Sequence, residues 1–202
     1  MKLIGMLDSP YVRRTAISLR LLKIAFEHRS ISVFSAFEQF RQLNPVVKAP
    51  TLICDDGTVL MDSALIIDHA ERMAGRSLMP ADLQGHRTAT RRVGLALVAC
   101  EKAIQIVYER NLRPAEKQHE PWVDRVRDQL LAAIAALEAE YSSQRIEIDE
   151  QRIDQATITT AVAWRFTQEM LPTIVCAGDY RALAALGEAA EKLPAFVAAP
   201  FG

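Results

Sequence analysis

The apolar pattern of this chain changes character once, near residue 75. Before that point, short apolar runs alternate with a segment of helical spacing at residues 10–23. From Gly85 onward the helical spacing continues almost without interruption. The pattern predicts an α/β N-terminal domain at 1–75, a linker at 76–84 and an all-helical C-terminal domain at 85–202.

The first domain is predicted to contain a small mixed sheet. Its expected strands are short runs at residues 3–7, 31–34, 51–54 and 58–61. The last two runs flank Asp55-Asp56-Gly57, a composition typical of a β-hairpin turn. Asp62 or Ser63 is then expected to cap a helix that Gly75 closes, whereas residues 36–44 form a polar stretch that the pattern leaves unassigned.

The second domain is predicted to be a bundle of helices. Apolar residues keep one helical face over residues 93–108 and again over 123–141, and Pro114 separates the two segments. Asp154 and Asp179 are expected to begin two further helices.

Composition narrows the classes of function. The net charge of -1, without a polybasic run, argues against nucleic acid or an anionic membrane as a partner. No apolar stretch approaches the roughly 20 residues of a membrane span, and the first residues resemble a strand rather than a signal segment, so we expect a cytoplasmic protein. The three cysteines and four histidines lack the spacing of a disulfide framework or a metal site. We therefore expect no metal, and cysteines that act as small buried residues.

A hydroxyl stands where the first strand is expected to meet the first helix. The segment Ser9-Pro10-Tyr11-Val12-Arg13-Arg14 directly follows the apolar run at 3–7. Serine before a proline at the first helical position is a favoured start signal, because the hydroxyl accepts from a backbone N–H and proline has none to lose. The positive end of the helix dipole also suits a bound anion. Ser9 is therefore either a structural cap or a hydroxyl that donates to an anion.

Two further segments carry candidate binding residues. Residues 44–52 place Pro50 at the start of a hairpin strand, where its missing N–H is tolerated. A cis bond between Ala49 and Pro50 would leave the backbone of Ala49 as an edge on which an extended peptide could pair. Asp62-Ser63 offers a carboxylate and a hydroxyl at a helix start, which suits a ligand with an ammonium and a carboxylate, or a plain helix cap.

Taken in this order, the segments resemble the cytosolic glutathione transferase family, and most closely its bacterial members with an N-terminal S-P-Y/F-V-R motif. The resemblance rests on four segments, namely S-P-Y-V-R-R from Ser9, N-P-V-V-K-A-P-T-L from Asn44, Asp62-Ser63, and L-P-A-F from Leu193. It implies the glutathione transferase fold, an α/β thioredoxin-like domain followed by an all-α helical bundle. It also implies glutathione as co-substrate, a small hydrophobic electrophile, a role in detoxification and a homodimer built on residues 63–73 and 91–110.

The resemblance further implies a role for each site residue. Ser9 would donate a hydrogen bond to the glutathione sulfur, and Ala49, held by cis Pro50, would pair with the cysteinyl unit. Asp62 and Ser63 would bind the γ-glutamyl end. The candidates for the glycyl carboxylate are Arg41, Gln42 and Lys48. An electrophile pocket between the domains would be lined by Tyr11, Tyr108 and Trp164, aromatic residues that the pattern equally places in the core.

Two other functions stay open. One is a non-catalytic regulatory or protein-binding module of the same fold, because fold does not fix function. The other is a glutathione-dependent thiol reductase, which Ser9 argues against because that reaction needs a cysteine at the helix start. Asp62 stands where many members have Glu or Gln, and Asp154–Thr157 reverses their usual S/T-x-x-D cap. Arg13 and Arg14 are expected on a solvated helix face.

Overall fold

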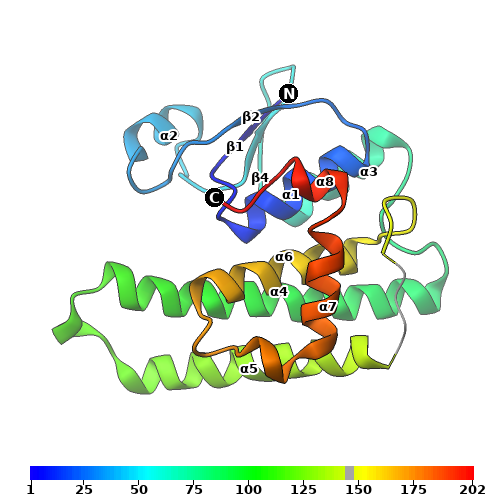
Figure 1. The fold of residues 1–202 in the computed structure, drawn as a ribbon. Coiled ribbons are helices and arrows are strands. Elements are labelled where there is room, and N and C mark those ends of the chain that lie inside the picture. Colours follow the sequence, from blue (N-terminus) through cyan, green and yellow to red (C-terminus); the bar gives the residue numbers. More distant parts are fainter. Residues whose placement is uncertain (144–147) are drawn as a thin grey trace. The chain divides into compact units, whose positions relative to one another are not determined.

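The computed structural model describes residues 1–143 and 148–202 (Figure 1). Two compact units are present, residues 1–78 with 193–202, and residues 79–192. The first contains a four-stranded sheet with helices and the second is helical, so the predicted fold class is confirmed. Residues 193–202 were expected with the helical domain, but they group with the first unit because the buried Phe196 packs there against Arg13.

The sheet of the first unit has the strand order β2-β1-β3-β4. Its strands are β1 (Lys2–Ile4), β2 (Glu27–Arg29), β3 (Thr51–Ile53) and β4 (Val59–Met61). β1 runs parallel to β2 and antiparallel to β3, and β4 completes the hairpin with β3. A parallel pair needs a crossover, which α1 (Pro10–Leu21) provides. Leu3, Ile4 and Leu52, on the two central strands, are fully buried.

The other helices of this unit are α2 (Phe37–Leu43), α3 (Ser63–Ala74) and α8 (Pro194–Val197). The stretch left unassigned thus contains α2. The expected strand at 31–34 is wrong, because Ile31 packs into a core cluster with Ile4 and Phe40 and the strand lies earlier, at Glu27–Arg29. Gly75 ends α3 with a φ of 62°, as its sequence position predicts.

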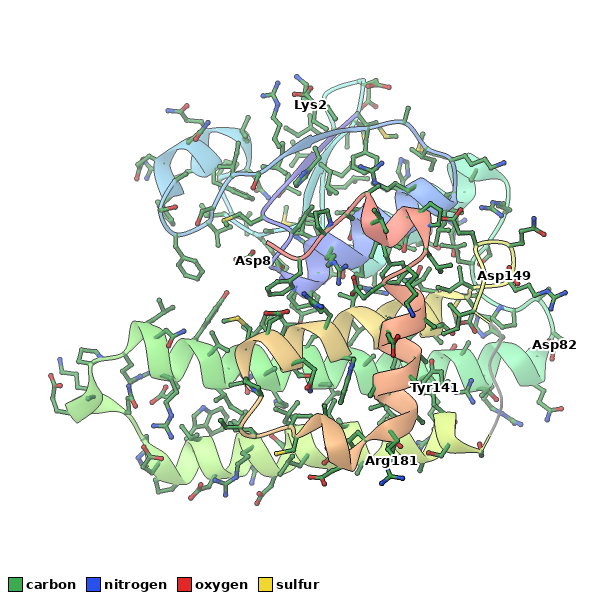
Figure 2. The ribbon with its side chains drawn as sticks, in the orientation of Figure 1. Lys2, Asp8, Asp82, Tyr141, Asp149 and Arg181 are labelled. Atoms are coloured by element: carbon green, nitrogen blue, oxygen red, sulfur yellow. The ribbon has the colours of Figure 1, made fainter. Side chains whose placement is uncertain are left out.

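The second unit consists of α4 (Leu83–Leu112), α5 (Glu120–Ser142), α6 (Gln155–Met170) and α7 (Arg181–Ala190). Two short 3-10 turns, Ala115–Lys117 and Ala177–Asp179, precede α5 and α7. α4 begins inside the expected linker, because Asp82 caps it by accepting from the N–H of Gly85 at 2.8 Å (Figure 2). Asp154 caps α6 through the N–H of Thr157 at 2.7 Å, so the reversed motif still caps a helix.

The core of the helical unit is fixed by buried polar contacts as well as by apolar packing. Tyr141 of α5, labelled in Figure 2, donates to Oγ1 of Thr160 at 3.2 Å and lies under the guanidinium of Arg92. Glu138 accepts from the N–H groups of Ala182 and Leu183, both at 2.9 Å, and so caps α7 from another helix. Within the described ranges, no helix combines the length and apolar character that crossing a membrane requires.

Candidate functional site

Ser9 is the N-cap of α1. Its backbone is extended, with φ -71° and ψ 121°, and Pro10 takes the first helical position. Ser9 Oγ accepts from the N–H of Val12 at 3.5 Å, the long end of hydrogen-bond geometry. Because the oxygen is the acceptor in this bond, the hydroxyl hydrogen remains to be donated. Ser9 therefore stands at a helix N-terminus with a weak cap bond and a usable donor.

Gly5 brings the start of α1 close to the proline segment. A Cβ on Gly5 would lie 2.6 Å from Cγ2 of Val12 and 3.1 Å from Cβ of Ala49, and its φ of 136° also favours glycine. Only a residue without a side chain permits this approach. Sequence analysis missed Gly5, although a glycine at the end of a buried strand is a signal of close backbone approach.

The segment before β3 is held by a buried amide. Nδ2 of Asn44 donates to Oγ1 of Thr51 at 2.8 Å, and that hydroxyl donates to the carbonyl of Lys48 at 2.7 Å. The bond between Ala49 and Pro50 is cis, as predicted. The chain of hydrogen bonds fixes the backbone on both sides of Ala49. The sequence analysis did not single out Asn44 for this role.

The start of α3 has an unusual backbone. Asp62 has a φ of 72°, a conformation that a residue with a side chain rarely adopts and that proteins often keep at functional positions. Its Oδ1 accepts from the N–H of Ala64 at 2.9 Å. Ser63 is buried, and its Oγ accepts from Nη1 of Arg14 at 3.0 Å. A permanent positive charge thus lies against the first residue of α3.

Both arginines of α1 are buried, so the expectation of a solvated face is wrong. α1 packs against α3 and α8, which cover the face that carries these side chains. Arg13 Nε donates to the carbonyl of Ala199 at 2.8 Å, and its guanidinium lies 5.7 Å from the centre of the Phe196 ring. Arg14 reaches Ser63 instead. Each arginine therefore links α1 to a segment far away in the sequence.

Comparison with known proteins identifies the first unit. Residues 3–77 match the family model described as "Glutathione S-transferase, N-terminal domain". Residues 3–77 therefore form a glutathione S-transferase N-terminal domain. A relative from Escherichia coli (strain K12), "Uncharacterized GST-like protein YibF", is 27% identical over 173 residues, which cover 85% of each protein.

Solved structures of glutathione transferases share the fold over nearly the whole length. A family member from Pseudomonas fluorescens Pf-5, with bound glutathione, is 28% identical with a TM-score of 0.81, and the match covers 98% of this chain and 97% of that one. A glutathione S-transferase from Methylobacterium radiotolerans, in complex with glutathione sulfonate, has a TM-score of 0.88 at 23% identity. That match covers 100% of this chain and 95% of the other.

The other site residues of the first unit that the family resemblance implied differ in exposure and in their partners. Arg41, on α2, is paired with Glu38, three residues away, and Gln42 beside it is exposed. Lys48 is exposed, next to the fixed Ala49 backbone. Tyr11 is partly buried in the first turn of α1. All four residues thus lie in the first unit, on α2, on α1 and in the segment before β3.

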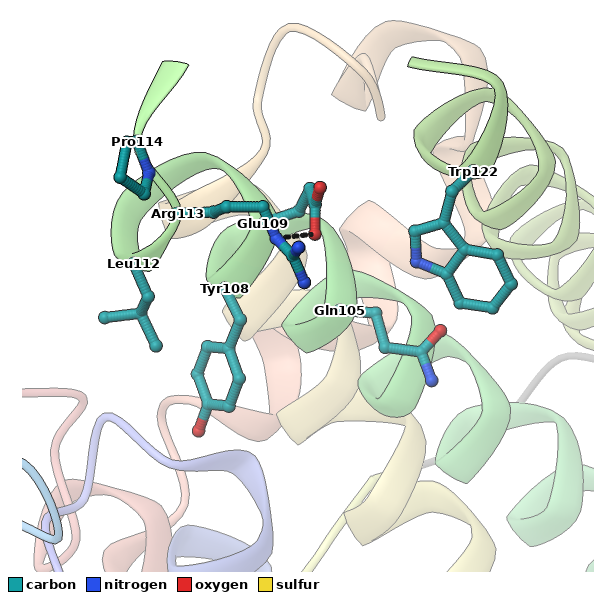
Figure 3. A pocket seen from close by; sticks show the side chains of 7 residues that line it. All are labelled: Gln105, Tyr108, Glu109, Leu112, Arg113, Pro114 and Trp122. Carbon is teal, nitrogen blue, oxygen red and sulfur yellow. Dashed lines mark ion pairs between the residues drawn. The ribbon is translucent and has the colours of Figure 1, made fainter. Parts of the chain in front are cut away.

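Trp164 is a core residue of the helical unit, which is the second of the two places that the sequence left open for it. Its side chain is only 6% exposed, and its ring meets that of Tyr180 edge to face with centroids 6.2 Å apart. A Cβ on Gly187 would lie 2.5 Å from Cδ1 of Trp164, so the ring fills the space that this glycine leaves. Tyr108, in contrast, is half-exposed and lines a hollow of about 450 Å³ (Figure 3).

The cysteines behave differently from one another. Cys100 is buried as expected, but Cys54 is only partly buried and Cys176 is exposed. Burial, followed by the nearby carboxylates of Asp56 and Asp55, raises the pKa of the Cys54 thiol. A raised pKa lowers the thiolate fraction and hence the reactivity of this thiol. In the described parts of the chain, no cluster of three or more His, Cys, Asp or Glu side chains is arranged to hold a metal ion.

Proposed function

We propose that this protein binds glutathione on its first unit and transfers the thiolate to a small hydrophobic electrophile. The observation that carries the proposal is the hydroxyl of Ser9 at the N-terminus of α1, the helix whose Val12 approaches Gly5 as closely as Ala49 does. The bound glutathione of the Pseudomonas fluorescens relative, at 28% identity, supports the same ligand here.

Ser9 would act by stabilising the sulfur anion. A thiol with a pKa of about 8.5 is only a few per cent ionised at neutral pH, and lowering the pKa by two units requires about 2.7 kcal/mol. A charge-assisted hydrogen bond contributes about 1.5–3 kcal/mol, and a helix N-terminus adds about 0.3–1 kcal/mol. The hydroxyl and the dipole of α1 together reach the required magnitude. Ser9 Oγ can accept the long hydrogen bond from the N–H of Val12 and donate its own hydrogen to the sulfur at the same time.

The tripeptide would be anchored by groups that the fold already holds in place. The backbone of Ala49 would pair with the cysteinyl unit, as in strand addition. Asp62 would accept from the ligand ammonium. Because Arg14 can only donate, Ser63 Oγ must accept from it, and the serine hydrogen would then be available for the γ-glutamyl carboxylate. Arg14 and the N-terminus of α3 would add positive potential at the same place.

The glycyl carboxylate and the electrophile have fewer fixed contacts. Among the three candidates for the carboxylate we favour Lys48, because its own carbonyl is held by Thr51 beside Ala49. The charge of Arg41 is offset by Glu38. Tyr11 follows Ser9 by two residues and is the candidate of the first unit for contact with the electrophile. We also propose a cytoplasmic homodimer, which light scattering would contradict by giving about 22.5 kDa, the mass of one chain, at micromolar concentration.

The alternatives are less well supported. A thiol reductase would need a reactive cysteine at the start of α1, where Ser9 stands, and the raised pKa of Cys54 makes that thiol a poor substitute. A non-catalytic binding module would keep the glutathione contacts without turnover. Activity of the parent protein therefore separates the two remaining candidates.

The test compares the parent protein with Ser9→Ala. Glutathione affinity by titration calorimetry should stay within several-fold, whereas turnover with a reactive aromatic halide should fall about ten- to a hundred-fold at pH 6.5 and recover as pH rises. Ser143→Ala removes a serine of the helical unit that donates to the carbonyl of Glu140, and should change neither quantity.

Three results would contradict the proposal. An unchanged rate and pH profile in Ser9→Ala would reduce Ser9 to a helix cap. Tight binding of glutathione by a parent protein without turnover would favour the non-catalytic module. A parent protein that does not bind glutathione would overturn the proposal as a whole.

A further inference from the structure

The loop between β1 and α1 carries Ser9, and the first residue of this loop is tied to β2. Gly5 directly follows β1, and its N–H donates to the backbone carbonyl of Arg29 at 3.0 Å. The carbonyl oxygen of Gly5 lies 2.8 Å from Nε2 of His28. Both polar backbone groups of Gly5 are therefore held by β2, the edge strand of the sheet.

The two hydrogen bonds of Gly5 differ in what they require of the sequence. The N–H of Gly5 uses a backbone carbonyl, which any residue at position 29 would offer. The carbonyl of Gly5, in contrast, needs a side chain with a donor at position 28. Because a carbonyl oxygen can only accept, Nε2 of His28 carries the hydrogen, in the neutral as well as in the charged ring. The His28 side chain thus fixes the direction of the Gly5 carbonyl.

Gly5 is also a place where the chain could easily turn. It is buried, with a φ of 136°. A buried carbonyl without a partner costs free energy, and a glycine allows the peptide unit that follows it to rotate. Without His28, the peptide unit between Gly5 and Met6 would turn its oxygen toward water. Such a rotation would displace Ser9, whose N–H donates to the carbonyl of Met6 at 3.2 Å.

We propose that His28 is a positioning residue for Ser9, because its hydrogen bond to Gly5 keeps the loop in a conformation in which the Ser9 hydroxyl meets the glutathione sulfur. The inference rests on the proposed transfer reaction and adds to it a residue outside the binding segments. His28 itself contacts neither glutathione nor the electrophile. Since a hydrogen bond weakens steeply as its geometry worsens, a small displacement of the loop is enough to lose the stabilisation of the sulfur anion.

Two variants separate the hydrogen bond from the packing of the imidazole ring. His28→Met keeps a side chain of similar volume but has no donor. His28→Gln places an amide nitrogen as many bonds from the backbone as Nε2 of the histidine, so it can donate to the Gly5 carbonyl. His86→Met is the control, since His86 is an exposed histidine on α4, in the helical unit.

The first measurement follows the loop without glutathione. Hydrogen–deuterium exchange, read by mass spectrometry, should be about ten-fold faster at residues 5–9 in His28→Met, because a lost hydrogen bond makes local opening easier. It should stay close to that of the parent in His28→Gln and His86→Met. If residues 5–9 exchange as slowly in His28→Met as in the parent, His28 does not hold the loop and the proposal is wrong.

The second measurement is the pKa of the bound thiol, taken from the ultraviolet absorbance of the thiolate in a pH titration at saturating glutathione. His28→Met should raise this pKa by about one unit and lower turnover with a reactive aromatic halide about ten-fold at pH 6.5, while glutathione affinity stays within several-fold. His28→Gln should restore the thiol pKa and the rate. A role in folding alone would lower stability in urea and leave both quantities unchanged.

The two measurements distinguish failure of this inference from failure of the proposed function. A thiol pKa that is unchanged in His28→Met, in a protein whose parent lowers it, would overturn the positioning role of His28. A parent protein that binds glutathione without lowering the thiol pKa would overturn the proposed transfer reaction, and with it the role of His28 in that reaction. The exchange of residues 5–9 then still shows whether His28 holds the loop.

Discussion

Replacing Arg13 should destabilise the first unit strongly, even though an arginine on a short helix suggests an exposed position. The guanidinium donates to the carbonyl of Ala199 at 2.8 Å and lies 5.7 Å from the ring of Phe196, with the side chain fully buried. A hydrogen bond from a charged donor contributes about 1.5–3 kcal/mol, and a desolvated cation–π contact about 1–2 kcal/mol. The cost of desolvating the guanidinium offsets part of this sum. We therefore expect Arg13→Met, which keeps the aliphatic stem, to lose about 2–4 kcal/mol.

Urea unfolding followed by circular dichroism measures this loss. Arg20→Met is the matched control, because Arg20 lies on the same helix with its guanidinium 5.3 Å from the Phe26 ring but is exposed, and should change stability by no more than about 0.5 kcal/mol. Combining Arg13→Met with Phe196→Leu should reveal a coupling of about 1 kcal/mol, since the two side chains touch. An Arg13→Met protein as stable as the parent would refute the reasoning that this buried contact holds residues 193–202 in place.

Three further predictions concern other parts of the molecule. Asp62→Ala should weaken glutathione about ten-fold in calorimetry, while the lost cap to Ala64 costs only about 1 kcal/mol of stability; the reverse pattern would make Asp62 purely structural. Hydrogen bonds from Arg91 and then Arg92 hold the pKa of Glu140 below its ordinary 4.5, so this stabilisation is present above pH 4.5 and lost as pH falls through the folded-state value. Glu140→Gln should accordingly flatten the acid limb of a stability-against-pH curve. Gly187→Ala should cost about 1–3 kcal/mol in thermal unfolding, because the added methyl would meet the Trp164 ring, and an unchanged melting temperature would contradict this packing.

The sequence predicts elements well where their signals are local. Ser9 before Pro10 locates the start of α1, Gly75 locates the end of α3, and the Asp55–Gly57 turn locates the hairpin. In each case the turn or cap chemistry is contained within a few residues. β2 was missed because its residues are charged and partly exposed, and it is a strand only through its pairing with β1.

The positions that sequence reasoning misjudged depend on partners far away in the chain. Arg13 and Arg14 are buried because Ala199 and Ser63 supply acceptors from 186 and 49 residues away. The family resemblance offered Trp164 for a pocket and the pattern equally offered it for the core, because helical spacing does not tell which neighbour a buried side chain meets; here that neighbour is Gly187. The candidate binding residues can therefore be found from short motifs, whereas the buried contacts that hold these residues in place cannot.

The first unit is discontinuous in the sequence, and this has a consequence for the order in which it can be completed during synthesis. Residues 79–192 separate its two parts. At roughly 5–20 residues per second, about 6–23 s pass between the synthesis of residue 78 and that of residue 193. During this interval the nascent chain has Arg13 without the carbonyl of Ala199 and without the ring of Phe196. A ribosome stalled within the helical segment would therefore hold an N-terminal unit whose α1 is not yet covered by residues 193–202. Such a unit would be more accessible to proteases and chaperones than the finished protein.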